Sequence, residues 1–453
     1  MISNQYIMNV TWKQTGRKIE FFFEPSVDDL TSLQKTSSGA TYQFGSRSCY
    51  FEMPDDWKSS TLHPDLMATA IAFMIDPFVK DTIVLPIGVS QKFHDDYFEL
   101  RQKKILPVDP QLGSRPLPDD SVPVLCFSGG VDSTAAAILM PKNTWLVFAD
   151  RDMDDPKQIG HYKKDAALFA CQQMQSKGHR VVKVLTNFEF IRDPMGFPTH
   201  FSSGVPAILL ADHFHSTTIA FGTVLESAFG IGDNKFTQPG GPWLKMLNAA
   251  GLPVSLVTGG LSEVATSKLI HDRKDYSDIA QSCMRGKVGA PCSKCMKCFR
   301  KSLLQLVFDK VSFHNMELDK MLTFPIIFIT MTKSPLHHED VYVYIYGKNR
   351  SFNLGHYLLR KKVRGTKKNK WLIKWFEESQ KYIAEKEREQ IKESLLRHFD
   401  VMTEKDVWQL KNWDPQTFNK SKRYRFWSWL FQKYASYYYE RGAPAKRERA
   451  KAK

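Results

Sequence analysis

The residues best suited to chemistry are Ser128-Gly129-Gly130-Val131-Asp132-Ser133, which lie between an apolar stretch at 122–127 and a helix-like stretch at 133–140. The two glycines let the backbone turn tightly and approach a ligand, and N–H groups at the start of a helix attract anions. The hydroxyls of Ser128 and Ser133 can extend that anion site. The loop is not of the G-x-x-x-x-G-K-[ST] type, because it lacks the lysine and contains an acidic residue. That residue, Asp132, can hold Mg2+ or cap the helix. The pattern predicts a pyrophosphate-binding loop, and a Gly-Ser turn without a ligand is the alternative.

The second chemical feature is a group of four cysteines, Cys283, Cys292, Cys295 and Cys298. Four thiolates complete a tetrahedral Zn2+ site, and such a closed site is structural rather than catalytic. An iron-sulfur cluster and free thiols are the alternatives. Basic residues near the cysteines, including Lys297 and Lys301, are expected to offset the negative charge of the thiolates.

The phosphate-loop sequence resembles the PP-loop of N-type ATP pyrophosphatases, which cleave ATP between its α and β phosphates. Four cysteines about 150 residues after such a loop resemble the 7-cyano-7-deazaguanine synthase family, and the likeness covers about 121–309. It implies an ATP-dependent, AMP-forming carbon-nitrogen ligase that uses Mg2+ and acts on a 7-deazaguanine-like or other carboxylate. Relatives with extra domains resemble components of anti-phage systems, which implies work within a multi-protein complex.

The resemblance also implies roles for single residues. Residues 128–133 would bind ATP, with Ser128, Asp132 and Ser133 as the catalytic positions, and Asp150 would meet the adenosine. Glu226, in the stretch 219–227, would face the substrate. Strand-end, capping or surface roles are the alternatives for both acids. We expect His213 and His215 to be packing or surface groups.

Two departures from the family pattern qualify the resemblance. Val257-Thr258-Gly259-Gly260 stands where the family usually has Leu-Thr-Lys with a phosphate-binding lysine. Lys268, Lys235 or Arg273 are the candidate replacements. After Glu226, residues 227–232 differ from the family's Ser-Gly-Tyr-Pro-Asp-Cys, so the substrate does not transfer. A nucleotide- or deazaguanine-binding scaffold without turnover is therefore a second hypothesis.

The basic residues concentrate near the C-terminus. Residues 301–453 hold 32 Lys and Arg against 17 Asp and Glu, which accounts for the whole formal net charge of +15. Basic residues at 360–370 precede Trp371, Trp375 and Phe376, and a second mixture follows at 422–429. Cations between aromatic rings can bind nucleic acid or a partner protein, whereas buried rings with solvated lysines are the plainer interpretation. A nucleic-acid-binding module regulated by the PP-loop core is a third hypothesis.

These residues need a scaffold, and the sequence predicts an α/β fold with a parallel sheet. Strand-like stretches at 122–127, 144–149, 180–185 and 217–222 alternate with helix-like ones at 133–140, 165–177 and 206–214, which is the rhythm of βαβ units. Four prolines within 104–122 indicate a linker. We expect an N-terminal α+β domain at 1–118, the PP-loop core with its zinc knuckle at 119–309, a helical basic region at 310–441 and a disordered basic tail at 442–453.

The flanks give weaker patterns. Hairpin turns are expected at 15–16 and 45–46, and a helix at 66–78. Farther on, 341–346 reads as a strand and 371–399 as a long helix. The mean hydropathy of −0.36 and the lack of an apolar run near 18 residues predict no membrane span. The first residues lack the pattern of a signal or transit peptide, so the sequence predicts a cytoplasmic protein.

Overall fold

The computed structural model describes residues 6–26, 33–35, 41–117, 122–152, 164–233, 235–283, 285–311, 321–348, 354–364 and 369–451. Within these ranges, the side chains of residues 416, 438 and 440–451 are outside the description.

A ten-stranded mixed sheet runs through the first half of the chain, in the order β13-β12-β8-β9-β10-β5-β2-β1-β6-β7. The first five of these strands are parallel, and β10 pairs antiparallel with β5. The bounds of the parallel strands are β8 Val122–Cys126, β9 Trp145–Arg151, β10 Arg180–Thr186, β12 Ser216–Phe221 and β13 Val254–Ser255. The predicted α/β class with a mostly parallel sheet is confirmed.

The N-terminal part supplies the other half of the same sheet. Its elements are β1 Ile7–Thr15, β2 Lys18–Pro25, β5 Ser48–Glu52, α1 Pro64–Ile75, β6 Thr82–Ser90, α2 Gln91–Arg101 and β7 Lys104–Asp109. Three short strands, β3 Gln34–Lys35, β4 Thr41–Phe44 and β11 Arg192–Asp193, form a separate small sheet. The hairpin turn expected at 15–16 is present, because Thr15 of β1 pairs with Lys18 of β2.

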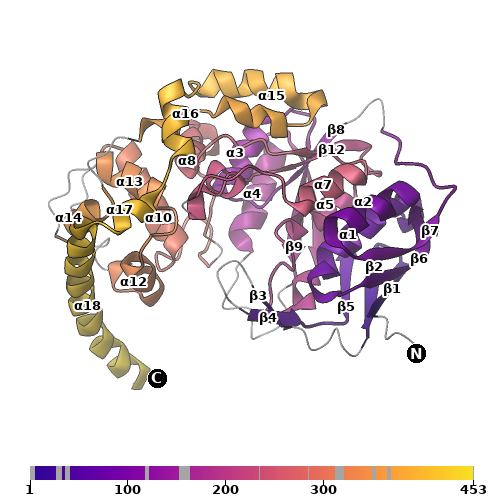
Figure 1. Cartoon of the computed structure of the whole chain (residues 1–453), viewed down its shortest axis with the longest axis horizontal. Helices are drawn as coiled ribbons and strands as arrows, with labels where there is room; N and C mark the ends of the chain where they lie inside the picture. Colours follow the sequence, from indigo (N-terminus) through magenta and orange to yellow (C-terminus); the bar gives the residue numbers. More distant parts are fainter. Residues whose placement is uncertain are drawn as a thin grey trace.

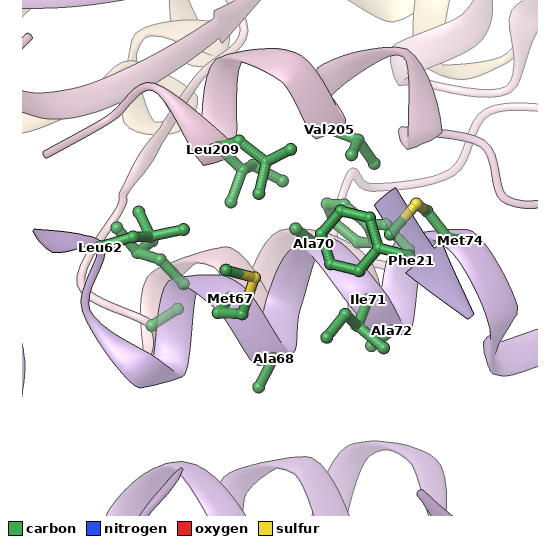
Figure 2. Packing of buried hydrophobic residues seen from close by; sticks show 14 of the residues in the cluster. Phe21, Leu62, Met67, Ala68, Ala70, Ile71, Ala72, Met74, Val205 and Leu209 are labelled. Carbon is green, nitrogen blue, oxygen red and sulfur yellow. The ribbon is translucent and has the colours of Figure 1, made fainter. Parts of the chain in front are cut away.

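One hydrophobic core lies across the expected boundary near residue 118. Helix α1 is buried along nearly its whole length between the sheet and helix α5 (Val205–Leu209). Figure 2 shows Phe21 of β2 on one side of α1 and Val205 and Leu209 of α5 on another. The Trp57 indole also donates a hydrogen bond to the Leu209 carbonyl at 2.8 Å. The N-terminal part and the parallel sheet therefore form one packed body.

The opposite face of the parallel strands is covered by helices that follow them. Side chains alternate across the sheet, so Val124 joins the core with α1 while Leu125 packs with the other helices. The helices that pack with Leu125 are α3 Val131–Leu139, α4 Asp165–Ser176, α8 Glu263–Asp272 and α9 Lys274–Ser277. The other helices of this half are α6 Leu225–Ala228, α7 Pro242–Ala249 and α10 Met296–Phe308, of which α7 packs in the core with α1.

The C-terminal region is helical, as expected. It contains α12 Pro325–Thr332, α13 Glu339–Lys348, α14 Leu354–Lys362, α15 Glu385–His398, α16 Glu404–Lys411, α17 Pro415–Asn419 and α18 Lys422–Lys451. Ile391 and Leu395 of α15 pack in the same cluster as α3, so this region folds back over the sheet. Figure 1 shows α18 extending away from the body at the end remote from the N-terminal part. The helix runs to Lys451, through most of the tail for which the sequence predicts disorder.

Several expectations for single elements are wrong. Residues 341–346 form part of helix α13, in which Val341 to Tyr346 are all buried. A strand-like composition is overridden there because the segment is enclosed by protein on all sides. Residues 371–399 form two 3-10 helices followed by α15 instead of one long helix. The helix expected at 206–214 is shorter, because α5 ends at Leu209.

Two turn assignments also differ. The linker expected at 104–122 begins with strand β7. Residues 45–46 are not a hairpin turn, because the Gly45 and Ser46 N–H groups donate to the carbonyls of Ile191 and Phe190. In the part of the chain that is described, no helix is long and apolar enough to cross a membrane.

Candidate functional site

The loop 128–133 joins the end of β8 to the start of α3. Strand β8 lies between β9 and β12, so the strand order reverses at this point. Open parallel sheets bind ligands at such a reversal, outside the carboxyl ends of the strands. Chain order and sheet order together place the loop at the most favourable position for a small anionic ligand.

Hydroxyl groups and a glycine fix the shape of the loop. The Ser128 N–H donates to Ser133 Oγ at 3.2 Å, and the two hydroxyls lie 3.0 Å apart. Gly129 has φ +72°, and a Cβ there would lie 3.0 Å from Ala167 Cα on α4. A side chain is therefore disfavoured at Gly129 by both its backbone conformation and its surroundings.

A cavity of about 590 Å³ opens beside the loop. Apolar walls come from Phe148, Phe201 and Phe221, which are typical surroundings for a purine ring. Polar groups at its edge include Ser128, Asp132, Arg151, His200 and Lys297. A second cavity of about 460 Å³ shares Gln281, Ser282, Cys283 and Lys297 with the first and adds Lys274 and Lys301.

The two aspartates predicted at this site have different surroundings. Asp132 lines the larger cavity, and its Oδ1 accepts a hydrogen bond from the Thr266 hydroxyl at 2.7 Å. Asp150, near the end of β9, forms an ion pair with Lys164 at 2.9 Å. The next residue, Arg151, lines the cavity, and sequence reasoning missed it.

Two cations beside the loop, Lys297 and Lys301, come from α10. Of the replacements expected for the missing lysine, Lys268 pairs with Asp272 and Arg273 with Asp275 in short local ion pairs. Lys235 lies in the turn after the 3-10 helix at Ile231–Asp233. The spacing of four between Lys297 and Lys301 was the available clue, because it places both on one side of a helix.

Lys297 and Lys301 have different surroundings. Lys297 is exposed and lines both cavities. Lys301 Nζ lies 4.0 Å from Asp132 and 3.0 Å from Glu263, and it donates to Ser267 Oγ. Lys297 is therefore the cation more available to a ligand.

Glu226 lies on α6 and is buried against the start of α8. Both carboxylate oxygens accept from the Glu263 N–H at 2.9 Å, and only 1% of the residue is exposed. Burial, together with the carboxyl groups of Asp340 and Glu263, raises the pKa of Glu226 well above its usual range. Its neighbours Val224 and Ser227 line the larger cavity, whereas the Glu226 side chain is held by the backbone of α8.

Glu263 belongs to a buried ion-pair group. Arg300 of α10 lies 2.8 Å from one carboxylate oxygen and Lys301 lies 3.0 Å from the other. Burial alone would raise the pKa of Glu263, but these two cations hold it well below its usual range. The pairs fix α10 against α8 and hence orient Lys297 and Lys301.

The four cysteines gather as predicted. Their Sγ atoms all lie within 4.8 Å of one another, and those of Cys292 and Cys298 are 3.7 Å apart. Four thiolates around one Zn2+ are about 3.8 Å apart, because the Zn–S distance is about 2.3 Å. Backbone N–H groups point at the sulfurs, with Cys292 N–H on Cys283 Sγ at 3.3 Å. The side-chain hydrogen bond with Cys298 lowers the pKa of Cys295 to about 5. The group could hold a metal ion such as zinc.

The segment leading into the cysteines touches the phosphate loop. The Gln281 N–H donates to the Gly129 carbonyl at 3.2 Å, and the Val131 N–H approaches Ser282 Oγ at 3.4 Å. Cys283 itself lines both cavities. The cysteine group and the phosphate loop are thus parts of one continuous structure.

The two histidines lie outside this site. His213 faces Asp56 at 3.5 Å, and His215 is an exposed residue with φ +51°. Neither lines a cavity next to the loop.

Residues 242–414 match a family of unknown function, DUF6395. This stretch contains the four cysteines and both lysines of α10, and it begins after the phosphate loop. No curated protein and no solved structure matches the chain. The match to this family therefore assigns no function, and the site geometry is the basis for a proposal.

Proposed function

We propose that this protein is an ATP-dependent ligase that releases AMP and pyrophosphate. The observation that supports this most is the Ser-Gly-Gly-Val-Asp-Ser loop at the strand-order reversal, which opens into a cavity with an aromatic wall and Lys297 at its edge. An aromatic wall suits adenine, and a cation beside helix N–H groups suits a polyphosphate. The core would be a PP-loop fold.

The proposed reaction begins when a carboxylate of the acceptor attacks the α-phosphorus of ATP. The bond to the β-phosphate oxygen breaks, which gives an acyl-adenylate and pyrophosphate. Ammonia or another amine then displaces AMP and leaves an amide, and a second adenylation could dehydrate that amide to a nitrile. A 7-deazaguanine carboxylate is the acceptor that the sequence resemblance suggests, and the same resemblance suggests a role in a multi-protein anti-phage system.

The chain's own residues would position ATP and neutralise the charge of the departing pyrophosphate. Backbone N–H groups of the loop, with Ser128 and Ser133, would hold the departing pyrophosphate, and Lys297 would offset its charge. Mg2+ bound with ATP supplies further charge neutralisation, and Asp132 is the only carboxylate among the described residues that line this cavity. A zinc ion on the four cysteines would be structural and would hold the segment 281–283 against the loop.

A pyrophosphate-release assay with ATP, Mg2+, ammonium and 7-carboxy-7-deazaguanine tests the proposal, with nucleotide and deazaguanine products followed by mass. The double variant Ser128→Ala/Asp132→Asn should lose about 100-fold or more in rate, and Lys297→Ala about tenfold or more. Lys268→Ala is the matched control, because its ammonium already pairs with Asp272 away from the loop. Equal losses in the Lys297 and Lys268 variants would contradict the assigned role of α10.

The second candidate is a nucleotide-binding scaffold without turnover. It is favoured by the glycines at 259–260, which stand where the 7-cyano-7-deazaguanine synthase family has a phosphate-binding lysine. The pairing of Lys301 with Glu263 also favours it. Tight ATP binding with no formation of AMP, whether or not the deazaguanine and ammonium are present, would support the scaffold. It would exclude the ligase for that acceptor.

A further inference from the structure

The aromatic residues of the basic C-terminal region fall into two groups. Trp371, Trp375 and Phe376 are at most 1% exposed. They follow the basic residues at 360–370, which we call the first basic cluster. The second group lies on α18, where Phe426 and Trp429 are 53% and 54% exposed. The first group is core, and only the second is available to a partner.

The cations of the first basic cluster divide in the same way. Lys362 is buried and donates to the carbonyls of Met331 and Lys333, while Arg364 lies over the Phe418 ring at 3.7 Å. Lys367 and Lys368 are outside the described residues. Lys361, however, lies 5.3 Å from the Tyr357 ring and 5.8 Å from the Trp427 ring, next to the exposed group on α18.

On α18, two aromatic rings lie between two cations along one side of the helix. Lys422, Phe426, Trp429 and Lys433 are all exposed and follow one another at spacings of four, three and four. Such spacing gives a single stripe about 16 Å long. We call these four residues the α18 stripe.

The α18 stripe is not the side that holds the helix to the protein. Tyr424, Phe431 and Ala435 are buried and take that role, and Phe431 and Ala435 pack in the cluster that contains residues of α12 and α14. The rings of Phe426 and Trp429 lie 6.4 Å apart on the outer side. Large exposed rings so close together are typical of an interaction surface.

Charge identifies the occupant. Residues 354–364 and 422–436 contain no Asp or Glu, so α14 and the first half of α18 present only positive charge. A single-stranded nucleic acid offers phosphates to the lysines and unpaired bases to the rings. Duplex bases are already stacked on one another, and an acidic peptide would use the cations while leaving the rings exposed. A membrane surface would favour an apolar side, but the apolar side of α18 is already buried against the protein.

We propose that the α18 stripe, with Tyr357 and Lys361 of α14 beside it, binds single-stranded nucleic acid. This surface is separate from the phosphate loop and does not depend on the proposed ligase activity. Bases stack on Phe426 and Trp429, and Lys422, Lys433 and Lys361 contact phosphates.

The test uses the full chain and fluorescein-labelled dT20 and rU20, with binding followed by anisotropy over a range of salt concentrations. Phe426→Ala/Trp429→Ala should weaken binding by about tenfold or more. Lys422→Ala/Lys433→Ala should reduce the slope of log affinity against log salt by about 1.4. Trp408→Ala is the matched control, because Trp408 is 66% exposed on α16, outside the stripe. All four substituted side chains of the stripe are exposed, so thermal unfolding should change little.

Two further measurements decide between occupants. Quenching of tryptophan fluorescence by dT20 should fall in Trp429→Ala and persist in Trp408→Ala. A 20-base-pair duplex should bind at least tenfold more weakly than dT20. Equal affinity for the duplex, equal losses in the Trp408 control, or binding to phosphatidylserine vesicles without binding to the oligonucleotides would overturn the proposal.

Discussion

The ligands of the cysteine group all come from residues 283–298, whereas the cavity beside the phosphate loop draws on β8, β9, β12, the segment 281–283 and α10. The cysteine group is a local structure whose ligand set is complete within one short stretch. The cavity is a non-local structure, since Arg151 lies about 20 residues after the loop and the lysines of α10 about 170 residues after it. The two are joined where Gln281 and Ser282 contact the loop. A metal ion on the four cysteines would therefore help to fix the geometry of the cavity.

The largest effect should come from breaking the cysteine group. Cys298→Ser should lower zinc content and destabilise the protein by more than about 4 kcal/mol, because metal binding supplies folding free energy. ATP affinity should fall with it, since residues 281–283 would no longer be held on the loop. Zinc content by mass spectrometry, thermal unfolding and ATP titration measure the three effects. Ser293→Ala, at an exposed position within the same stretch, is the control. Unchanged ATP affinity after complete zinc loss would show that the two sites are independent.

The next effect tests how α10 is held. Arg300→Met leaves Glu263 with a buried, incompletely paired carboxylate and should cost about 3–5 kcal/mol of unfolding free energy. Arg273→Met removes a more exposed pair with Asp275 and should cost less than about 1 kcal/mol. Denaturant unfolding of both variants measures the difference. Similar small costs would mean that the cysteine group alone positions α10.

A smaller effect is expected where β12 ends against the loop. A Cβ at Gly222 would lie 2.8 Å from Ser133 Cα, so Gly222→Ala must displace the start of α3. We expect a cost of about 1–3 kcal/mol and weaker ATP binding. Gly240→Ala is the matched control, because a Cβ there meets nothing within 4 Å. Thermal unfolding and ATP titration distinguish the two variants, and full ATP affinity in Gly222→Ala would argue against a phosphate site at the start of α3.

The last effect is a pH dependence that comes from buried acids on α6, α8 and α13. Burial raises the pKa of Asp340 to about 7, with the carboxyl group of Glu263 of α8 adding to the shift and that of Glu226 of α6 opposing it. Because the folded pKa lies above the unfolded value, the stabilisation is greatest below about pH 4 and is lost as pH rises through 7.

Asp340→Asn should remove up to about 1.4 kcal/mol per pH unit of this slope between pH 4 and 7. Denaturant unfolding at several pH values measures it. Glu339→Gln should remove a slope of similar size, because burial also raises the pKa of Glu339 to about 7, against the opposing effects of the Leu336 N–H and Lys362. An unchanged slope in Asp340→Asn would show that this carboxyl stays charged in the folded protein.

Much of the fold could be predicted because the relevant patterns are local. The strand at Val122–Cys126, the helix that begins at Val131 and the helix α1 follow from runs of apolar residues, and Gly129 and Gly130 mark the turn between the first two. The strand expected at 341–346 was wrong because the composition of α13 suits either structure and only its enclosure on all sides decides. The division near residue 118 stays a prediction, although β5 and β10 join both parts in one sheet.

The candidate site was predictable in the same uneven way. The four cysteines and the loop residues Ser128 to Ser133 stand close together in the sequence, so their types and spacing were sufficient. Lys297 and Lys301 were interpreted only as counter-charges for the thiolates, because nothing in the spacing shows that α10 returns to the loop. Glu226 could not be assigned from its neighbours, since its role depends on where α8 begins in space.

The sequence by itself determined the cysteine ligand set, the glycine-rich turn between a strand and a helix, and the positive charge of the C-terminal region. Each depends on residues that are adjacent or nearly adjacent in the chain. Only the tertiary structure decided which cations reach the loop, which acids are buried and which aromatic rings remain exposed. Those properties depend on packing between distant segments, and burial and distance are not encoded in any single stretch of residues.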